Sequence, residues 1–230
     1  MGILGIVLVT LSALAAPAAK APAAPNAEAD KLWEQVIETY RAMTTYSDHG
    51  TSVTRYKREH TPNQTQVTFE THYKRPGKLK FTWTLQPKVT PATKWSVVGS
   101  NGEQAWLKLA TAPDKPTARP SLAVAVEGAR GNSHWTAAEI PRLLDESIAA
   151  KKIVTLKNKK LAGTAHIGDQ DYIILTAQDE TNAERKVWIG KTDHLIRKVL
   201  VTEANGTTRE EDRLDIKVNE LIPEATFAEE

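Results

Sequence analysis

The sequence predicts an α+β protein that is mainly antiparallel β, built as a strongly curved, half-open β-barrel of about ten strands with an N-terminal helix and inserted lid helices. Apolar residues first recur at helical spacing and then alternate with polar ones in many short segments. Two short helical patterns interrupt the strands near the middle of the chain. Because such helices cannot bury their apolar faces alone, we expect them to cover the open mouth or the concave face of the sheet.

The N-terminal helix is predicted from a single apolar stripe. Its residues recur at spacings of three and four, which places them on one helical face: Leu32, Trp33, Val36, Ile37, Tyr40 and Met43. From residue 46 onward the period changes to two, which predicts strands over 51–58, 67–73 and 79–85. Asn101-Gly102 between the apolar runs 95–99 and 104–109 predicts a hairpin.

The strand pattern breaks after residue 110. Three prolines fall within 111–120, and the apolar residues that follow suggest two short helices on either side of 128–133. Thr136 followed by Glu139 resembles a capping box at the start of the second helix. Strands are then predicted over 153–156, 172–176, 186–189, 195–203 and 207–218, with a hairpin at Asn205-Gly206.

The N-terminal residues predict export. The run from 1 to 16 is almost wholly apolar and leads into small residues and prolines, as in a secretory signal peptide, although the first positive charge comes only at Lys20. We expect residues 1–24 to be the signal peptide and an Ala/Pro-rich linker, and residues 25–230 to form one domain. The mature protein would then be soluble and periplasmic.

Composition excludes several function classes. The chain has no cysteine, which removes disulfides, thiol nucleophiles, lipidated cysteine and thiolate metal sites. The 30 basic and 28 acidic residues are spread along the chain, so no one-signed field favours nucleic acid. We expect no nucleic-acid partner and no cofactor.

Residues for catalysis or metal binding form no recognisable motif. The common hydrolase, zinc-protease and nucleotide-binding motifs are absent, and the six histidines are scattered singly. His166, Asp169 and Asp171 are explained by a turn at Gly168. The run 210–213, Glu-Glu-Asp-Arg, is interpreted as a solvated surface. We therefore expect neither an enzyme nor a metal site.

Four segments resemble the LolA-like family of periplasmic lipoprotein carriers and their outer-membrane lipoprotein-sorting relatives. Residues 73–81 (Tyr-Lys-Arg-Pro-Gly-Lys-Leu-Lys-Phe) are similar to the family's Lys-Arg-Pro strand junction, and 100–107 (Ser-Asn-Gly-Glu-Gln-Ala-Trp-Leu) to its Ser-Asp-Gly hairpin, with Asn101 in place of aspartate. Residues 188–199 resemble the family's late hairpin and 218–227 its closing segment. The helical segment 121–149 does not match the family's lid closely.

The resemblance implies a half-open barrel with a helical lid that accepts the acyl chains of a lipoprotein. It also implies that Arg75, at the position of the family's junction arginine, is a latch that hydrogen-bonds the closed lid. The predicted ligand-binding residues are large apolar side chains on the sheet and lid, chosen without knowing which face of each strand is concave: Phe81, Trp83, Trp106, Leu122, Val126, Trp135, Leu143 and Leu144. Packing alone also explains most of the six tryptophans.

The partners expected for such a carrier are lipoprotein acyl chains or lipid, together with inner- and outer-membrane envelope proteins, and the protein would act as a monomer. One alternative is a periplasmic sensor or assembly adaptor that binds a protein partner, with the pocket structural or regulatory. Another is a hydrolase, which would need a polar titrating cluster in the cavity. The carrier hypothesis instead predicts apolar walls.

Overall fold

The computed structural model describes residues 27–57, 64–86, 95–148 and 153–229. The predicted signal peptide and linker at 1–24 lie outside these residues. So does most of the turn expected at 61–64.

One helix, six strands, three short helices and five more strands follow one another along the described chain, and a 3-10 helix ends it. Their bounds are α1 Ala27–Ala42, β1 Thr45–Arg55, β2 Gln64–Lys74, β3 Lys78–Gln86, β4 Ser96–Asn101, β5 Ala105–Leu109, β6 Ala112–Arg119, α2 Leu122–Ala129, α3 Thr136–Glu139, α4 Pro141–Leu144, β7 Lys157–Ile167, β8 Gln170–Gln178, β9 Glu184–Gly190, β10 Ile196–Thr202, β11 Thr208–Val218 and η1 Glu224–Phe227.

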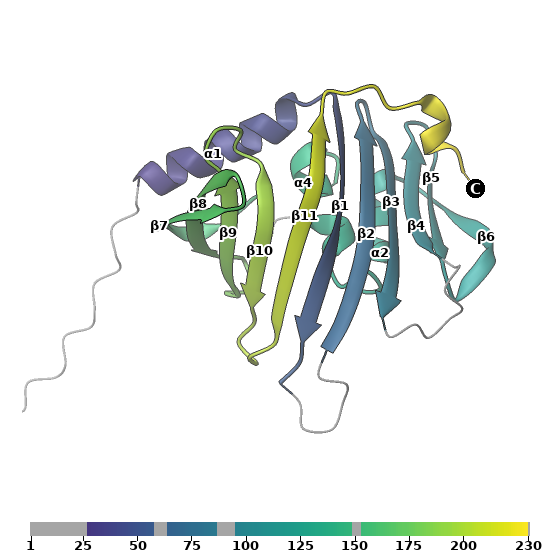
Figure 1. Cartoon of the computed structure of the whole chain (residues 1–230). Helices are drawn as coiled ribbons and strands as arrows, with labels where there is room; N and C mark the ends of the chain where they lie inside the picture. Colours follow the sequence, from purple (N-terminus) through teal and green to yellow (C-terminus); the bar gives the residue numbers. More distant parts are fainter. Residues whose placement is uncertain (1–26, 58–63, 87–94, 149–152, 230) are drawn as a thin grey trace, which may run out of the picture.

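All eleven strands form one antiparallel sheet in the order β6-β5-β4-β3-β2-β1-β11-β10-β9-β8-β7 (Figure 1). Two meanders therefore meet at a single seam, where β1 pairs with β11. β6 and β7 stand at opposite ends of this order, so the sheet stays open. The predicted half-open barrel with an N-terminal helix and inserted helices is confirmed, with eleven strands.

The inserted helices cover one face of this sheet, and we call residues 122–144, from α2 to α4, the lid. Figure 1 shows α2 and α4 behind the central strands. The covered face, here called the interior face, shares one hydrophobic core with the lid and with the apolar stripe of α1. α1 packs on β7 and α4, and its Tyr40 hydroxyl accepts a hydrogen bond of 3.0 Å from the Ile196 amide of β10.

Both predicted Asn-Gly hairpins are present. Asn101 Oδ1 accepts hydrogen bonds from the amides of Glu103 and Gln104, at 2.9 and 2.8 Å, in the turn between β4 and β5. Gly102 and Gly206 have φ values of 98° and 81°, which other residues rarely adopt. The turn at Gly168 likewise joins β7 to β8.

Two strand predictions were wrong. Residues 153–156 form a turn rather than a strand, although Ile153 and Leu156 are buried, and the strand is β7. β7 was missed because most of it is exposed and two register shifts interrupt its pairing with β8. The proline-rich segment 111–120 contains β6, which tolerates proline because it is an edge strand with one unpaired side.

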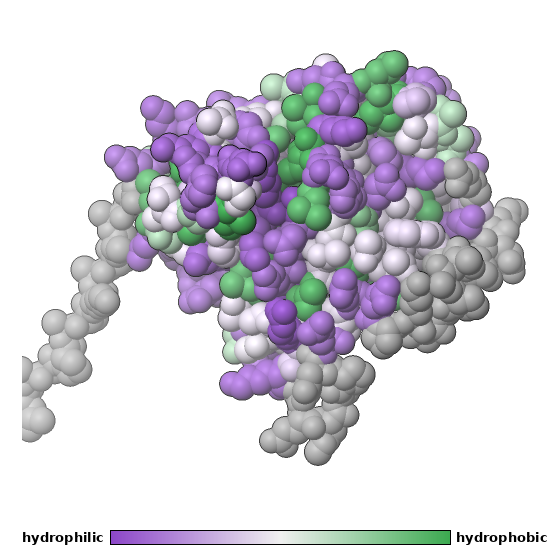
Figure 2. Space-filling view, viewed as in Figure 1, coloured by the Kyte–Doolittle hydropathy of each residue, from purple (hydrophilic) through white to green (hydrophobic). Residues whose placement is uncertain are grey.

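The outer face of the sheet is mainly hydrophilic, with smaller hydrophobic areas (Figure 2). Lys74 and Lys78 pair there with Glu224 of η1, at 2.5 and 2.6 Å. Among the described residues, no helix is long and apolar enough to cross a bilayer.

Candidate functional site

The interior face of β2 and β3 carries a row of aromatic rings. Phe69 of β2 lies opposite Trp83 of β3, and Phe81 sits two residues before Trp83 on the same face. Ring centroids are 5.6 Å apart for Phe69 and Phe81, and 5.9 Å apart for Phe81 and Trp83. The indole Nε1 of Trp83 donates a 3.0 Å hydrogen bond to the Asn132 carbonyl in the lid. The aromatic row is thus a floor that the lid touches directly.

Most predicted lid residues belong to the same core as this floor. Phe81 and Trp83 share it with four apolar side chains of the lid, each 7% exposed or less: Leu122, Val126, Leu143 and Leu144. The sequence therefore identified two sheet residues and four lid residues that the structure brings into one cluster. In this closed arrangement the lid side chains fill the space over the floor.

Trp106 does not join this cluster, contrary to the prediction that grouped it with Phe81 and Trp83. It pairs with Gly99 in β4, whereas its neighbour Leu107 pairs with Val98 and belongs to the core. A Cβ built on Gly99 would lie 2.5 Å from the Trp106 indole, so the ring packs across the glycine. Alternation along β5 thus places Trp106 on the other face of the sheet.

Trp135 lies apart from the apolar cluster, at the start of α3. Its φ of 73° and the φ of 49° at His134 are two consecutive left-handed conformations. The Arg130 guanidinium stacks over the Trp135 ring at 4.2 Å, and the ring lines a polar pocket rather than an apolar groove.

The expected capping box at Thr136 is absent, which corrects the prediction. Thr136 Oγ1 donates to the Ser133 carbonyl at 2.6 Å, and the Ser133 hydroxyl instead accepts from the Ala137 amide at 3.2 Å. Glu139 turns away from the helix start toward buried arginines of the sheet.

Arg75 connects the β2–β3 turn to the lid. Its Nη2 donates a 2.6 Å hydrogen bond to the Leu144 carbonyl at the end of α4, and its Nε donates to the Met43 carbonyl at 2.8 Å. Beside it, the Tyr73 hydroxyl donates to Asp145 Oδ2 at 3.1 Å. These contacts hold the end of α4 against the first strands.

The interior face of β11 is charged, which contradicts the interpretation of residues 210–213 as a solvated surface. Arg209, Glu211 and Arg213 point inward and are 7%, 0% and 2% exposed. Arg213 donates to Asp48 of β1 and, at 2.6 Å, to Glu211 Oε1, while Arg209 donates to Glu211 Oε2 at 2.7 Å. The expectation of wholly apolar walls was therefore wrong for this part of the interior.

Gly50 allows the charged and aromatic parts of the interior face to meet. It lies opposite Phe69 on one side and Arg213 on the other, and the Arg213 guanidinium stands 4.7 Å over the Phe69 ring. A Cβ at position 50 would lie 2.6 Å from the Phe69 ring.

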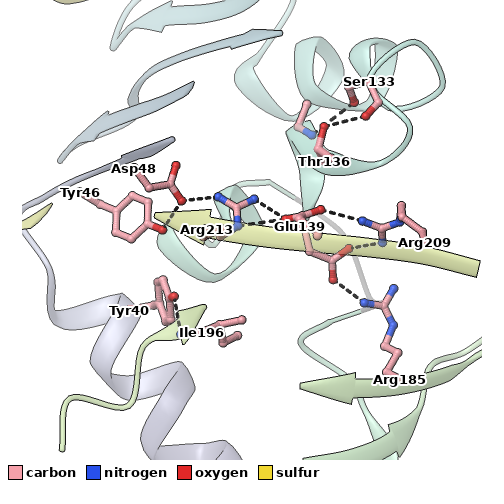
Figure 3. Close-up of polar contacts among 12 residues, drawn as sticks. Tyr40, Tyr46, Asp48, Ser133, Thr136, Glu139, Arg185, Ile196, Arg209 and Arg213 are labelled. Carbon is pink, nitrogen blue, oxygen red and sulfur yellow. Dashed lines mark hydrogen bonds and ion pairs between the residues drawn. The ribbon is translucent and has the colours of Figure 1, made fainter. Parts of the chain in front are cut away.

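Glu139 connects this network of buried charged side chains to the lid (Figure 3). Its Oε2 accepts from Arg209 at 2.8 Å and its Oε1 accepts from Arg185 of β9, which also bonds Asp179 at 3.2 Å. Burial alone would raise the pKa of Glu139, but the charges of the two arginines outweigh it and hold this pKa at about 2. Burial raises the pKa of Glu211.

Sequence reasoning missed this network because charged runs at strand positions are usually solvated. The sequence pattern that could have revealed it is the alternation of side chains along the strand. Arg209, Glu211 and Arg213 lie on one face of β11, whereas Glu210 and Asp212 lie on the other. The described residues contain no group of three or more side chains suited to a metal ion.

No protein family model and no curated protein sequence matches the chain. Solved structures with a similar fold include the lipoprotein LppX of Mycobacterium tuberculosis, with a TM-score of 0.51 and 13% identity, covering 86% of this chain and 98% of that one. LprF of Mycobacterium bovis gives a TM-score of 0.51 at 8% identity, covering 86% and 96%.

MucB also resembles this chain, with a TM-score of 0.51, 13% identity and coverage of 90% of this chain and 65% of MucB. This chain thus spans about two thirds of MucB. Identities this low show a shared fold and do not transfer a ligand. The comparisons show that the chain, with its open eleven-stranded sheet and its helices, shares the fold of LppX, LprF and MucB.

Proposed function

We propose that this chain is a periplasmic carrier that binds acyl chains of a lipoprotein or lipid between its interior face and its lid. The observation that carries the proposal is the aromatic floor of Phe69, Phe81 and Trp83 beneath apolar lid helices. An apolar ligand needs such a surface, and no cofactor is required to bury it.

Binding requires the lid to move, because its own side chains cover the floor. Leu143 and Leu144 are 1% and 0% exposed, and Val126 is 1% exposed. Lifting the lid exposes this area to water at a cost of about 25 cal/mol for each Å² of apolar surface. An acyl chain that takes the place of these side chains restores the burial, so the ligand stabilises the open state.

Arg75 is suited to act as the latch of the closed state in this proposal. Its guanidinium is half-buried and bonds the Leu144 carbonyl, which leaves when α4 moves. Because its bonds to the carbonyls of Met43 and Tyr40 do not involve the lid, Arg75 keeps partners while the lid is open.

Changing Leu143 and Leu144 to aspartate tests the lid assignment. We expect the double variant to lose acyl binding, because two charges would have to enter the apolar core over the floor. Mature protein purified from its native envelope is compared by native and denaturing mass spectrometry for copurifying lipid or lipidated protein. Far-ultraviolet circular dichroism checks that the sheet remains folded.

Val124→Asp is the matched control, since Val124 lies on α2 but is 46% exposed. It should retain the acyl species. Undiminished lipid in a folded Leu143→Asp/Leu144→Asp variant would contradict the lid assignment. A wild-type protein that carries no lipid but captures one specific envelope protein would instead support the adaptor hypothesis.

A further inference from the structure

The Glu139 carboxylate fills a site formed by two arginines from separate strands. Arg185 comes from β9 and Arg209 from β11, and each gives one guanidinium nitrogen to a different oxygen of Glu139 (Figure 3). The side chains of the two arginines are 1% and 8% exposed, and that of Glu139 is 5% exposed. The sheet thus has a pair of buried guanidinium groups arranged to bind two oxygens of one anion.

A small pocket of about 20 Å³, which has room for about one water molecule, adjoins this site, and Trp135, Arg185 and Arg209 are among the residues that line it. Two acidic residues line it as well. Asp179 is engaged by Thr181 and Arg185, whereas Glu203 is exposed. Withdrawal of Glu139 would therefore leave both arginines facing this pocket.

The charges on the sheet side balance without Glu139. Arg185, Arg209 and Arg213 give three positive charges, and Asp48, Asp179 and Glu211 give three negative charges when ionised. Glu139 adds one further negative charge from the lid. The need for an anion at this place is therefore set by hydrogen bonding: without Glu139, one buried guanidinium N–H donor of Arg185 and one of Arg209 lose their carboxylate partner, which is strongly unfavourable.

We propose that Arg185 and Arg209 form the headgroup site for a monoanionic amphiphile, whose carboxylate or phosphodiester oxygens replace those of Glu139 when the lid opens. This inference rests on the proposed acyl-binding function. The exchange leaves the net charge of the site unchanged, whereas a neutral lipid would leave both arginines incompletely paired. A dianionic headgroup would make the site one charge more negative than it is with Glu139.

The headgroup site adjoins the apolar part of the interior. Glu139 is followed directly by Ile140, which is 0% exposed within the same core as Leu143. Arg213 shares the partner Glu211 with Arg209, and its guanidinium contacts the ring of Phe69. Head and tail of one amphiphile can therefore occupy neighbouring parts of one interior.

Ligands with equal tails and different headgroups test the proposal. Oleate and dioleoyl phosphatidylglycerol are compared with oleyl alcohol and dioleoylglycerol, using displacement of a fluorescent acyl probe from the mature full-length protein. We expect each anionic ligand to bind at least about tenfold more tightly than its neutral counterpart, as charge-assisted hydrogen bonds permit. Preference within only one of the two pairs would identify the carboxylate or the phosphodiester as the source.

Two variants separate the headgroup site from lid stability. Glu139→Gln should tighten the binding of anionic and neutral ligands alike, because it weakens the closed state that both must open. The ratio of the affinities for anionic and neutral ligands should persist, because the arginines still bind the headgroup of the anionic ligand and not that of the neutral one. Glu139→Gln combined with Arg209→Gln removes both partners of one ion pair and should lower the ratio, because only Arg185 remains to bind the headgroup, while neutral ligands still bind.

Arg55→Gln is the control, because the Arg55 side chain is 52% exposed and pairs with Glu210 away from the site. It should leave the ratio unchanged. Equal affinity of wild-type protein for anionic and neutral ligands would overturn the headgroup site while leaving acyl binding intact. Failure to bind any of the four ligands would overturn the proposed function and this inference together.

Discussion

Arg209, Glu211 and Arg213 show how one strand divides its residues between two environments. Their neighbours Glu210 and Asp212 pair with Lys198 on the other face of β11. Buried ion pairs of this kind add little net stability compared with apolar packing, but the loss of one partner is costly. Single substitutions in the network should therefore have larger effects than the same changes on the outer face.

The low pKa of Glu139 makes the stability of the protein pH-dependent. A carboxyl group with a pKa of about 2 when folded, below its ordinary value near 4.5, contributes stability above the ordinary value that is lost as the pH falls toward 2. Between pH 5 and pH 3, we expect the free energy of unfolding to fall more steeply in wild type than in Glu139→Gln, by roughly 1–3 kcal/mol. Urea unfolding at the two pH values measures the difference.

Glu34→Gln on the exposed face of α1 serves as the control and should follow the wild-type slope. Parallel pH dependence of wild type and Glu139→Gln would show that the Glu139 carboxylate does not titrate as its two arginine partners require.

The lid is the element whose attachment matters most for the proposed function. It is tied to the sheet by the Trp83 bond to Asn132, the Arg75 bond to Leu144 and the pairing of Glu139 with Arg185 and Arg209. Each tie sits at a different part of the lid. Losing one should therefore loosen part of the lid before it affects the strands.

Replacing Arg75 with methionine should free the end of α4. We expect hydrogen exchange at the amides of Leu143, Leu144 and Asp145 to become about tenfold faster, which corresponds to the loss of a charge-assisted hydrogen bond. Amides of β2 and β3 should keep their protection, and the neighbouring Lys74→Met, on the outer face, should leave α4 unchanged. Equal acceleration across β2, β3 and α4 would contradict a latch specific to the lid.

The sequence predicted elements well where local signals agree with the tertiary structure. Three local patterns are retained in the fold: the Asn-Gly turns, the apolar stripe of α1, and the placement of Phe81 and Trp83 on the same face of β3. The prediction for Trp106 was wrong because its size suggested a place in the core. Its pairing with Gly99 instead places it on the outer face of the sheet. The Glu139 site was not predictable because its arginines lie 46 and 70 residues away in the chain.

At the scale of the whole molecule, an open sheet must protect its two edges from other chains. Pro116 lacks a backbone N–H and so interrupts the donors of β6, and β7 is irregular because of its register shifts. Features of this kind discourage edge-to-edge pairing.

Pro116→Val tests this protection. It restores a backbone N–H and raises strand propensity on β6, so we expect self-association to increase at high protein concentration. Sedimentation velocity measures the change, and Ala118→Val on the same strand is the control that leaves the donors unaltered. Unchanged sedimentation of Pro116→Val would show that proline at this edge does not limit association.

The seam between β1 and β11 has a consequence for biosynthesis. β1 is made early, but the strand that completes its pairing, β11, is made after all the other described strands. Until residues 208–218 have been synthesised, Asp48 lacks Arg213 and Glu139 lacks Arg209. A translation product that stops before β11 therefore keeps an open strand edge and two acidic side chains that each lack one arginine partner, which makes it a substrate for chaperones and proteases.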